Sequence, residues 1–154
     1  MPWANGRGTS YEIASDRNAG EWTWRLAMAP VNEDGAFSRF ECVNRFLAVV
    51  EGAGMLLSVD RKKLQCQPMQ VVRFRGDAIT DATLTDGPIT DINLMIRRKE
   101  SDGEMAIVAE AGLLQGASMS LLLVEEHRCN AVIPRLISIL MTRYSSVTLK
   151  KSRL

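Results

Sequence analysis

The chain has 154 residues, with 19 Lys and Arg against 18 Asp and Glu, so its formal net charge at pH 7 is +1. This near-neutral balance argues against a dedicated nucleic-acid-binding protein, which normally carries a basic surplus. A chain of this length can bury a hydrophobic core without disulfides or a structural metal. Its three cysteines are scattered and form no Cys-x-x-Cys pair, so neither a disulfide framework nor a zinc site is indicated.

The sequence begins Met1-Pro2-Trp3-Ala4-Asn5-Gly6, which has neither the basic start nor the apolar core of a signal peptide. No apolar run reaches the length that a membrane-spanning helix needs. We therefore expect a cytoplasmic protein without a membrane partner, and the charge balance leads us to expect no nucleic-acid partner.

Two segments alternate between apolar and polar side chains, which is the pattern of a strand with two different faces. In residues 22–28, Arg25 lies on the face opposite the large apolar side chains. In residues 91–97, Asn93 and Arg97 lie on the face opposite three aliphatic side chains. Because one solvated face is normal for an antiparallel strand, the arginines either face water or line an interior.

The remaining strands are expected to be short and to end at turn residues. Residues 45–50 and 55–59 flank the turn sequence Glu51-Gly52-Ala53-Gly54 and are expected to pair as a hairpin. Residues 135–141 fit both a strand and a helical stripe, and we favour a strand. Further strands are expected at residues 70–74, 82–85, 105–109, 119–124 and 147–149. Short strands of this kind, without helical crossovers, predict an all-β protein with a closed or two-sheet architecture.

Metal ligands are scarce in this chain. A catalytic metal in a small β-barrel needs about three ligands at one point, and histidines usually supply most of them. The single histidine, His127, lies in the charged stretch Glu125-Glu126-His127-Arg128, which we interpret as an exposed loop. No Asp-x-Asp-x-Asp cluster and no Gly-x-Ser-x-Gly motif is present. We therefore expect no metal and no cofactor, and the sequence identifies no catalytic residue.

Three stretches, taken in order, resemble the HutD/Ves family. The first is residues 1–14, which contain Trp-x-Asn-Gly-x-Gly from Trp3 to Gly8, followed by Glu12. The second stretch combines residues 24–29, 35–40, 45 and 51–52, and the third combines residues 74–77 and 86–97. Three ordered motifs are far more specific than a single glycine pattern.

The resemblance implies an RmlC-like cupin fold with two cupin halves in a single domain, residues 1–154. The first half would end at about residue 98, and the second, from about residue 99 to 154, would be shortened. The family's association with histidine utilisation implies a ligand such as formylglutamate or a related pathway acid, and a second association is with a stress response. A shortened second half can leave a sheet edge open, which would allow a homodimer to form.

The alternation and the motifs together define the candidate ligand contacts. Guanidinium groups bind carboxylates bidentately and an amide offers a donor and an acceptor, so Arg25, Asn93 and Arg97 suit a small acidic, amide-like ligand. The motifs of the resemblance add four further candidates: Trp3, Asn5, Glu12 and Arg45. For Arg45, an ion pair with Glu51 is the structural alternative, and for Asn5 it is a tight turn.

The leading functional prediction is a metal-independent, small-molecule-binding protein, because the fold offers an interior and no catalytic set is complete. One alternative is a metal-independent isomerase or hydrolase that uses Glu12, Glu51 or Asp91 for proton transfer. This alternative requires a carboxylate with a shifted pKa in the interior. Another alternative is a dimeric interaction module whose interior is closed.

Overall fold

The computed structural model describes residues 8–17, 19–108, 119–128, 131–141 and 148–149. These residues form strands and turns and contain no helix, which confirms the prediction of an all-β protein. Accordingly, no helix in the described part of the chain is long and apolar enough to cross a membrane. The strands are β1 (Tyr11–Ser15), β2 (Trp24–Val31), β3 (Gly35–Ala36), β4 (Val43–Glu51), β5 (Met55–Val59), β6 (Lys62–Cys66), β7 (Val71–Arg75), β8 (Thr80–Leu84), β9 (Ile89–Arg97), β10 (Gly103–Val108), β11 (Met119–Arg128), β12 (Ala131–Met141) and β13 (Thr148–Leu149).

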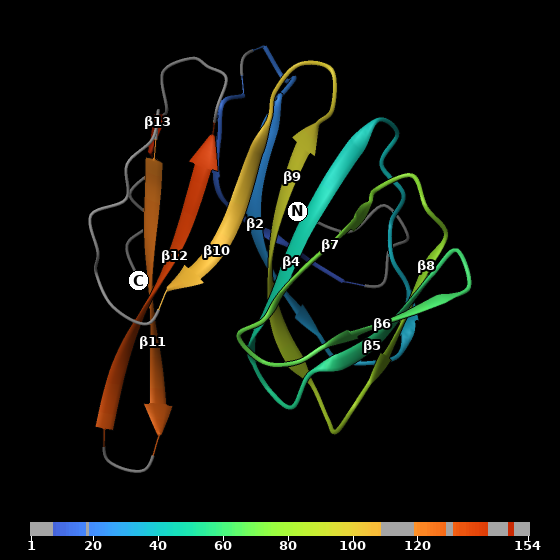
Figure 1. Cartoon of the computed structure of the whole chain (residues 1–154), viewed down its shortest axis with the longest axis vertical. Coiled ribbons are helices and arrows are strands. Elements are labelled where there is room, and N and C mark those ends of the chain that lie inside the picture. Colours follow the sequence, from blue (N-terminus) through green and yellow to red (C-terminus); the bar gives the residue numbers. More distant parts are fainter. Residues whose placement is uncertain (1–7, 18, 109–118, 129–130, 142–147, 150–154) are drawn as a thin grey trace.

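The strands form three sheets. A six-stranded sheet has the order β13-β1-β2-β9-β4-β7, a four-stranded sheet has the order β3-β8-β5-β6, and a three-stranded sheet has the order β10-β12-β11. The six-stranded sheet lies in the middle, with β5, β6 and β8 on one side and β10, β11 and β12 on the other (Figure 1). Each face of the central sheet is therefore covered by other strands.

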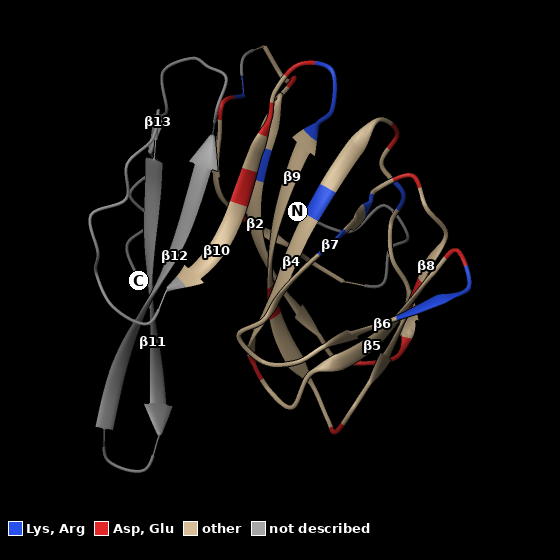
Figure 2. Cartoon of the chain, in the orientation of Figure 1, with Lys and Arg blue, Asp and Glu red and all other residues tan. Residues whose placement is uncertain are grey.

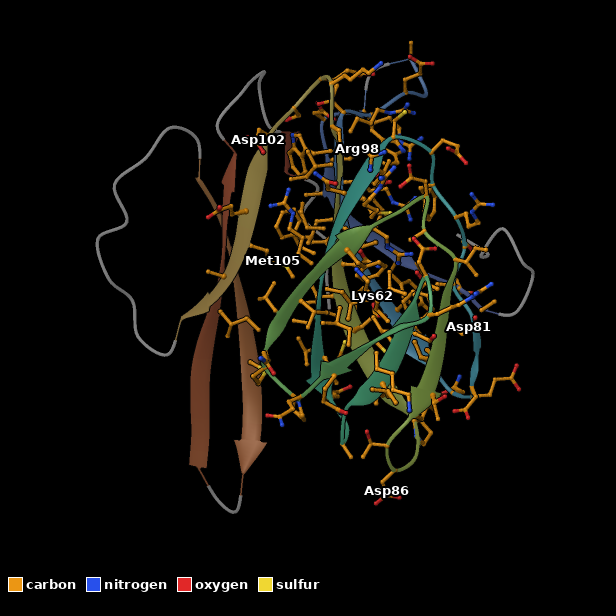
Figure 3. All side chains as sticks on the ribbon, turned by 45° about the vertical axis from the view of Figure 1, so that its right-hand side comes forward. Lys62, Asp81, Asp86, Arg98, Asp102 and Met105 are labelled. Atoms are coloured by element: carbon orange, nitrogen blue, oxygen red, sulfur yellow. The ribbon has the colours of Figure 1, made fainter. Side chains whose placement is uncertain are left out.

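Two core clusters occupy the two faces of the central sheet. One contains Trp24, Leu26 and Leu94, and it packs against Met105 and Ile107 of β10. Figure 3 shows Met105 on β10, the strand that lies beside this face of the central sheet. The other cluster lies between the central and four-stranded sheets, and its members are Val31, Leu47, Val49, Met55, Leu57, Cys66, Val72, Phe74, Ala82 and Ile89. Because β2, β4 and β9 contribute to both clusters, these strands are buried on both faces.

The expected hairpin between residues 45–50 and 55–59 does not form. Strand β4 pairs with β7 and β9, whereas β5 pairs with β6 and β8, so Glu51-Gly52-Ala53-Gly54 carries the chain from one sheet to the other. The hairpin is instead β5–β6, a strand missed because Lys62–Cys66 is largely polar. Its two-residue turn, Asp60-Arg61, has positive φ at both positions, as turns of type I′ require.

The chain passes between the sheets at a tight approach that requires glycine. Gly54 has a φ of +98°, and a Cβ added there would lie 2.5 Å from the backbone oxygen of Cys66. Gly87 also has positive φ, at +71°, but an added Cβ would meet no atom within 4 Å. A substitution at Gly87 therefore incurs only the free-energy cost of the backbone conformation, whereas one at Gly54 incurs that cost and the cost of a clash.

We expect Gly54→Ala to destabilise the protein more than Gly87→Ala does. The left-handed backbone should cost each variant about 1–2 kcal/mol, and the clash with Cys66 should cost Gly54→Ala about 1–3 kcal/mol more. Urea unfolding of the two variants and the wild type measures both terms. Equal losses in the two variants would show that the sheet-to-sheet passage tolerates a side chain.

Candidate functional site

Four polar side chains lie on the inner face of the central sheet, and strand alternation predicted two of them, Arg25 and Asn93. Arg25, Arg45, Asn93 and Asp91 share the strand faces that carry Val31, Leu47 and Ile89, which pack toward the four-stranded sheet. Arg25, Arg45 and Asn93 are each 6% exposed and Asp91 is 2% exposed. The alternative in which Arg25 faces water is therefore wrong. Figure 2 shows basic positions on β2 and β4 at the centre of the molecule, whereas most charged positions lie near its periphery.

Register places the two buried arginines on either side of the central strand. Arg25 on β2 and Arg45 on β4 are both paired with Met95 of β9. From Met95 toward the start of β9, the next two residues on the same face are Asn93 and then Asp91. The four polar residues thus form one continuous group, called here the inner polar cluster.

Aromatic rings surround the guanidinium of Arg45. Its Cζ lies 5.0 Å from the ring centre of Phe37, 5.7 Å from that of Phe40 and 5.2 Å from that of Phe74. Ring faces attract cations, and the attraction is larger where water is excluded. Phe37, Phe40 and Phe74 therefore contact a buried cation.

The hydrogen bonds of Arg45 go to neutral acceptors. Its Nε donates to Oδ1 of Asn93 at 3.4 Å, and its Nη1 donates to the backbone oxygen of Ser38 at 3.2 Å. The alternative ion pair with Glu51 is absent, since the exposed Glu51 carboxylate accepts a hydrogen bond from Thr90 instead. Burial lowers the pKa of Arg45 to about 10, against the opposing effect of the Asp91 charge, and the nearby Arg25 lowers it further. Arg45 therefore remains a cation at neutral pH.

Arg25 contacts the neighbouring strand β1 and the residue that precedes it. Its Nη2 donates to Oγ of Ser10 at 3.1 Å, and its Nε lies 3.5 Å from Oε2 of Glu12. That second contact lacks hydrogen-bond geometry, so the buried Nε has no hydrogen-bond partner in the described part of the chain. Burial lowers the pKa of Arg25, and the Glu12 charge acts in the opposite direction.

Glu12 is shared between two arginines. Its carboxylate accepts hydrogen bonds from Arg17 and Ser15, each at 2.9 Å. Burial raises the pKa of Glu12, but these hydrogen bonds and the charges of Arg17 and Arg25 outweigh it and lower the pKa overall. Glu12 is therefore a carboxylate at neutral pH, and much of its negative charge is already offset by Arg17.

Asp91 is the acid of the inner polar cluster and its most buried member. Its Oδ1 is buried and has no hydrogen-bond partner among the residues that the structure describes. Burial raises the pKa of Asp91 to about 7, although the charge of Arg45 acts to lower it. Burial and the Asp91 charge also raise the pKa of the Cys66 thiol to about 12. Asp91 is thus the carboxyl group here that can gain or lose a proton near neutral pH.

The other predicted site residues are differently placed. Arg97 lies on the expected face of β9 but at its end, where Nε donates to the backbone oxygen of Trp22 at 2.8 Å and the guanidinium lies 5.1 Å from the Trp22 ring centre. Trp3 and Asn5 lie outside the described residues. His127 lies in strand β11, paired with Val132, so the loop interpretation of its segment is wrong. An unbroken run of charged and titratable residues, Glu125-Glu126-His127-Arg128, concealed this end of the strand.

Two arginines outside the inner polar cluster share one carboxylate partner. Arg75 and Arg98 both donate to the carboxylate of Asp77, with closest distances of 2.9 and 2.7 Å. Hydrogen bonds from Arg75 and Arg98 hold the pKa of Asp77 well below its usual range. Within the described ranges, no three His, Cys, Asp or Glu side chains converge as a metal-binding group.

The raised pKa of Asp91 predicts a pH-dependent stability. A carboxyl group with a raised pKa in the folded state stabilises the fold at low pH, and this contribution is lost as pH rises from near 4 through about 7. Relative to Asp91→Asn, the wild type should lose about 2–3 kcal/mol between pH 5 and pH 8.5. Urea unfolding at several pH values measures this difference.

Asp86→Asn is the matched control, because Asp86 is an exposed carboxylate that points away from the molecule at the tip of a loop (Figure 3). This variant should differ from the wild type by less than about 0.5 kcal/mol at either pH. Parallel stability curves for Asp91→Asn and the wild type would contradict the assignment of a proton to Asp91.

Comparison with known proteins places the chain in a family. An uncharacterized 21.2 kDa protein from the hutC 3′ region of Pseudomonas putida is 37% identical over 98 residues, which is 62% of this chain and 52% of that protein. The chain thus matches about half the length of this curated relative.

Two solved structures are similar over most of the chain. A conserved protein of unknown function from Pseudomonas aeruginosa PAO1 has a TM-score of 0.78 and 27% identity, with 93% of each chain covered. HutD from Pseudomonas fluorescens SBW25 has a TM-score of 0.72 and 29% identity, with 94% of each chain covered. The family model described as HutD matches residues 1–148. The chain therefore belongs to the HutD family.

Proposed function

We propose that this protein binds a small carboxylic acid between its central and four-stranded sheets, without a metal, through Arg25 and Arg45. The observation that carries the proposal is a buried pair of guanidiniums with too little negative charge around them. Arg45 hydrogen bonds only to neutral groups in the described structure, and Arg25 shares Glu12 with Arg17. A ligand carboxylate supplies the missing charge.

Energetics favour this interpretation over a purely structural one. Taking a charged side chain out of water costs several kcal/mol unless an opposite charge and hydrogen bonds offset it. The two arginines also repel each other, since Arg25 lowers the pKa of Arg45. Asp91 offsets only part of this charge, because it is partly protonated near neutral pH. A bound carboxylate can accept two hydrogen bonds from one guanidinium, which is the strongest pairing available to either side chain.

Family association supports a candidate for the acid. One relative comes from the hutC 3′ region and one solved relative is HutD. We therefore propose formylglutamate, or another acid of histidine utilisation, as the ligand, with a role in modulating that pathway; the stress-response association is the alternative setting. The central and four-stranded sheets, which face each other, would form the first cupin-like half. The residues after about 98 would form the shortened second half.

A thermal-shift screen with formylglutamate, formiminoglutamate, urocanate, glutamate and simple sugars tests the proposal. A ligand at 100 times its Kd adds about 2.7 kcal/mol to the stability, which raises the Tm of a protein this size by roughly 5–10 °C. Arg25→Gln and Arg45→Gln should each remove most of the shift caused by the acid.

Arg73→Gln provides the control. Arg73 is exposed on β7, where its guanidinium stacks over Phe46 of the other core cluster. This variant should keep the full ligand-induced shift. The proposal fails if no acid in the screen shifts the Tm, or if Arg45→Gln and Arg73→Gln respond alike.

A second candidate function is proton transfer by a metal-independent isomerase or hydrolase, and the position of Asp91 favours it. A general acid or base works best with a pKa near the operating pH, and burial gives Asp91 a pKa of about 7. Glu51 is exposed, and Glu12 is engaged by Arg17 and Ser15, so Asp91 fits this role best among the three carboxylates considered.

Incubation with the acids of the screen, followed by proton NMR, tests this second function. If Asp91 transfers a proton, turnover should depend on pH with an apparent pKa near 7, and Asp91→Asn should reduce the rate by about 100-fold or more. Asp86→Asn should keep the wild-type rate. Unchanged substrates after prolonged incubation with the wild type would exclude these acids as substrates.

A further inference from the structure

We propose that residues 37–42 form a gate over Arg45, which opens to admit an acid and closes over the bound acid. This inference rests on the proposed function and deepens it, because it names the element that controls access to the site. The segment, called here the gate segment, joins β3 of the four-stranded sheet to β4 of the central sheet. In Figure 1 it is the thin trace that leads into β4.

The gate segment supplies most of the cover of Arg45. Two of the three rings around the guanidinium, those of Phe37 and Phe40, belong to it. So does the Ser38 backbone oxygen that accepts a hydrogen bond from Nη1. The third ring and the amide lie on strands β7 and β9 of the central sheet. Displacing the gate segment therefore exposes the guanidinium without any change in the sheets.

Single backbone hydrogen bonds, and no strand pairing, attach the gate segment to the sheets. The Phe37 N–H donates to the backbone oxygen of Thr80, and the Phe40 N–H donates to that of Gly76, each at 2.8 Å. None of the residues in the segment belongs to a strand, whereas β4, which follows it, pairs with both β7 and β9. Regions of this kind open locally at a lower free energy than paired strands do.

The charge of Arg45 favours the open form when no acid is bound. A buried cation without a negative partner loses the hydration that it has in water. In the closed form, the hydrogen bonds of Arg45 go to neutral acceptors. Opening returns water to the guanidinium, which offsets the loss of the ring contacts. Cys42, where the gate segment ends, has a φ of +58°, so the closed form also strains the backbone there.

A bound carboxylate reverses this balance. Once it pairs with Arg45, closure no longer buries a cation that lacks a negative partner. Ion pairs in water contribute little, whereas the same charges attract each other strongly where water is excluded. The acid therefore binds the closed form more tightly than the open form. A ligand with such a difference in affinity shifts the population toward the form that it prefers.

Amide hydrogen exchange of the full chain, followed residue by residue by NMR, tests this inference. Without ligand, the Phe37 and Phe40 amides should exchange about 100-fold faster than those of Leu47 and Leu94, because gate opening leaves the central sheet intact. N-formylglutamate at about 100 times its Kd should slow the two gate amides about tenfold or more, because it favours the closed form.

The Thr85 amide is the internal control. It donates to the backbone oxygen of Gly54 at 3.1 Å and follows the end of β8 that is opposite to Thr80. Local opening there is not coupled to the gate segment, so N-formylglutamate should leave its exchange rate unchanged. Equal slowing of the Thr85 and gate amides would show general stabilisation and would contradict gate closure.

Gly76→Ala tests the gate by destabilising its closed form. A Cβ added at Gly76 would lie 3.0 Å from the Phe40 backbone oxygen, and Gly76 does not have positive φ. The gate amides of this variant should exchange about tenfold faster. N-formylglutamate should associate and dissociate about tenfold faster, while its Kd changes less than about twofold because the closed form still predominates. NMR line shapes from a titration measure both rates.

Gly87→Ala is the matched control. It adds a methyl group at a position of positive φ where no atom lies within 4 Å, so it lowers stability without pressing on the gate segment. Its exchange rates at Phe37 and Phe40 and its binding rates should equal those of the wild type. If Gly76→Ala does not fold, the exchange measurements on the wild type still decide the question.

The outcomes separate the two proposals. If N-formylglutamate binds and the gate amides keep their exchange rates, the gate is wrong and the proposed function stands. The gate is also wrong if Gly76→Ala leaves the association and dissociation rates unchanged. If no acid of the thermal-shift screen binds to the wild type, the proposed function and this inference fail together.

Discussion

The central constraint on this structure is the burial of β4 and β9 on both faces. Most strands of an antiparallel sheet keep one face in water, where polar side chains need no partner. In this protein the three-stranded sheet covers one face through Met105, and the four-stranded sheet covers the other. The buried polar residues of these strands must therefore find their partners inside the protein. Arg45, Asn93 and Asp91 are the residues on which this requirement falls.

Some arginines have a negatively charged partner and Arg45 has only neutral hydrogen-bond partners among the described residues, and this difference indicates where a ligand would bind. Arg45 is stabilised by three aromatic rings, an amide and a backbone carbonyl, none of which is charged. By contrast, Arg75 and Arg98 have an ordinary ion pair with Asp77. A protein that needed Arg45 only for packing could use an apolar residue of similar size at lower cost. A buried cation held by neutral groups is better suited to a carboxylate from outside.

Much of the sheet architecture could be predicted from the sequence, because alternation reports directly on strand faces. It placed Arg25, Asn93 and Arg97 on shared faces, but it could not tell an inner polar face from a solvated one. Pairing was harder: two apolar runs around a glycine-rich turn resemble a hairpin, although the glycines here carry the chain between sheets. The aromatic surroundings of Arg45 and the burial of Asp91 depend on contacts between distant strands, which no local pattern contains.

The sharing of strands between two cores also determines the folding unit. The core cluster that contains Met105 of β10 also contains residues of β2, β4 and β9, including Trp24 and Leu94. Separated from the later strands, the first part of the chain would present this large apolar face to water, and exposed faces of that kind lead to association. Strand β10 therefore helps to keep this apolar face out of water, and we expect the chain before residue 98 to expose the face if it is expressed alone.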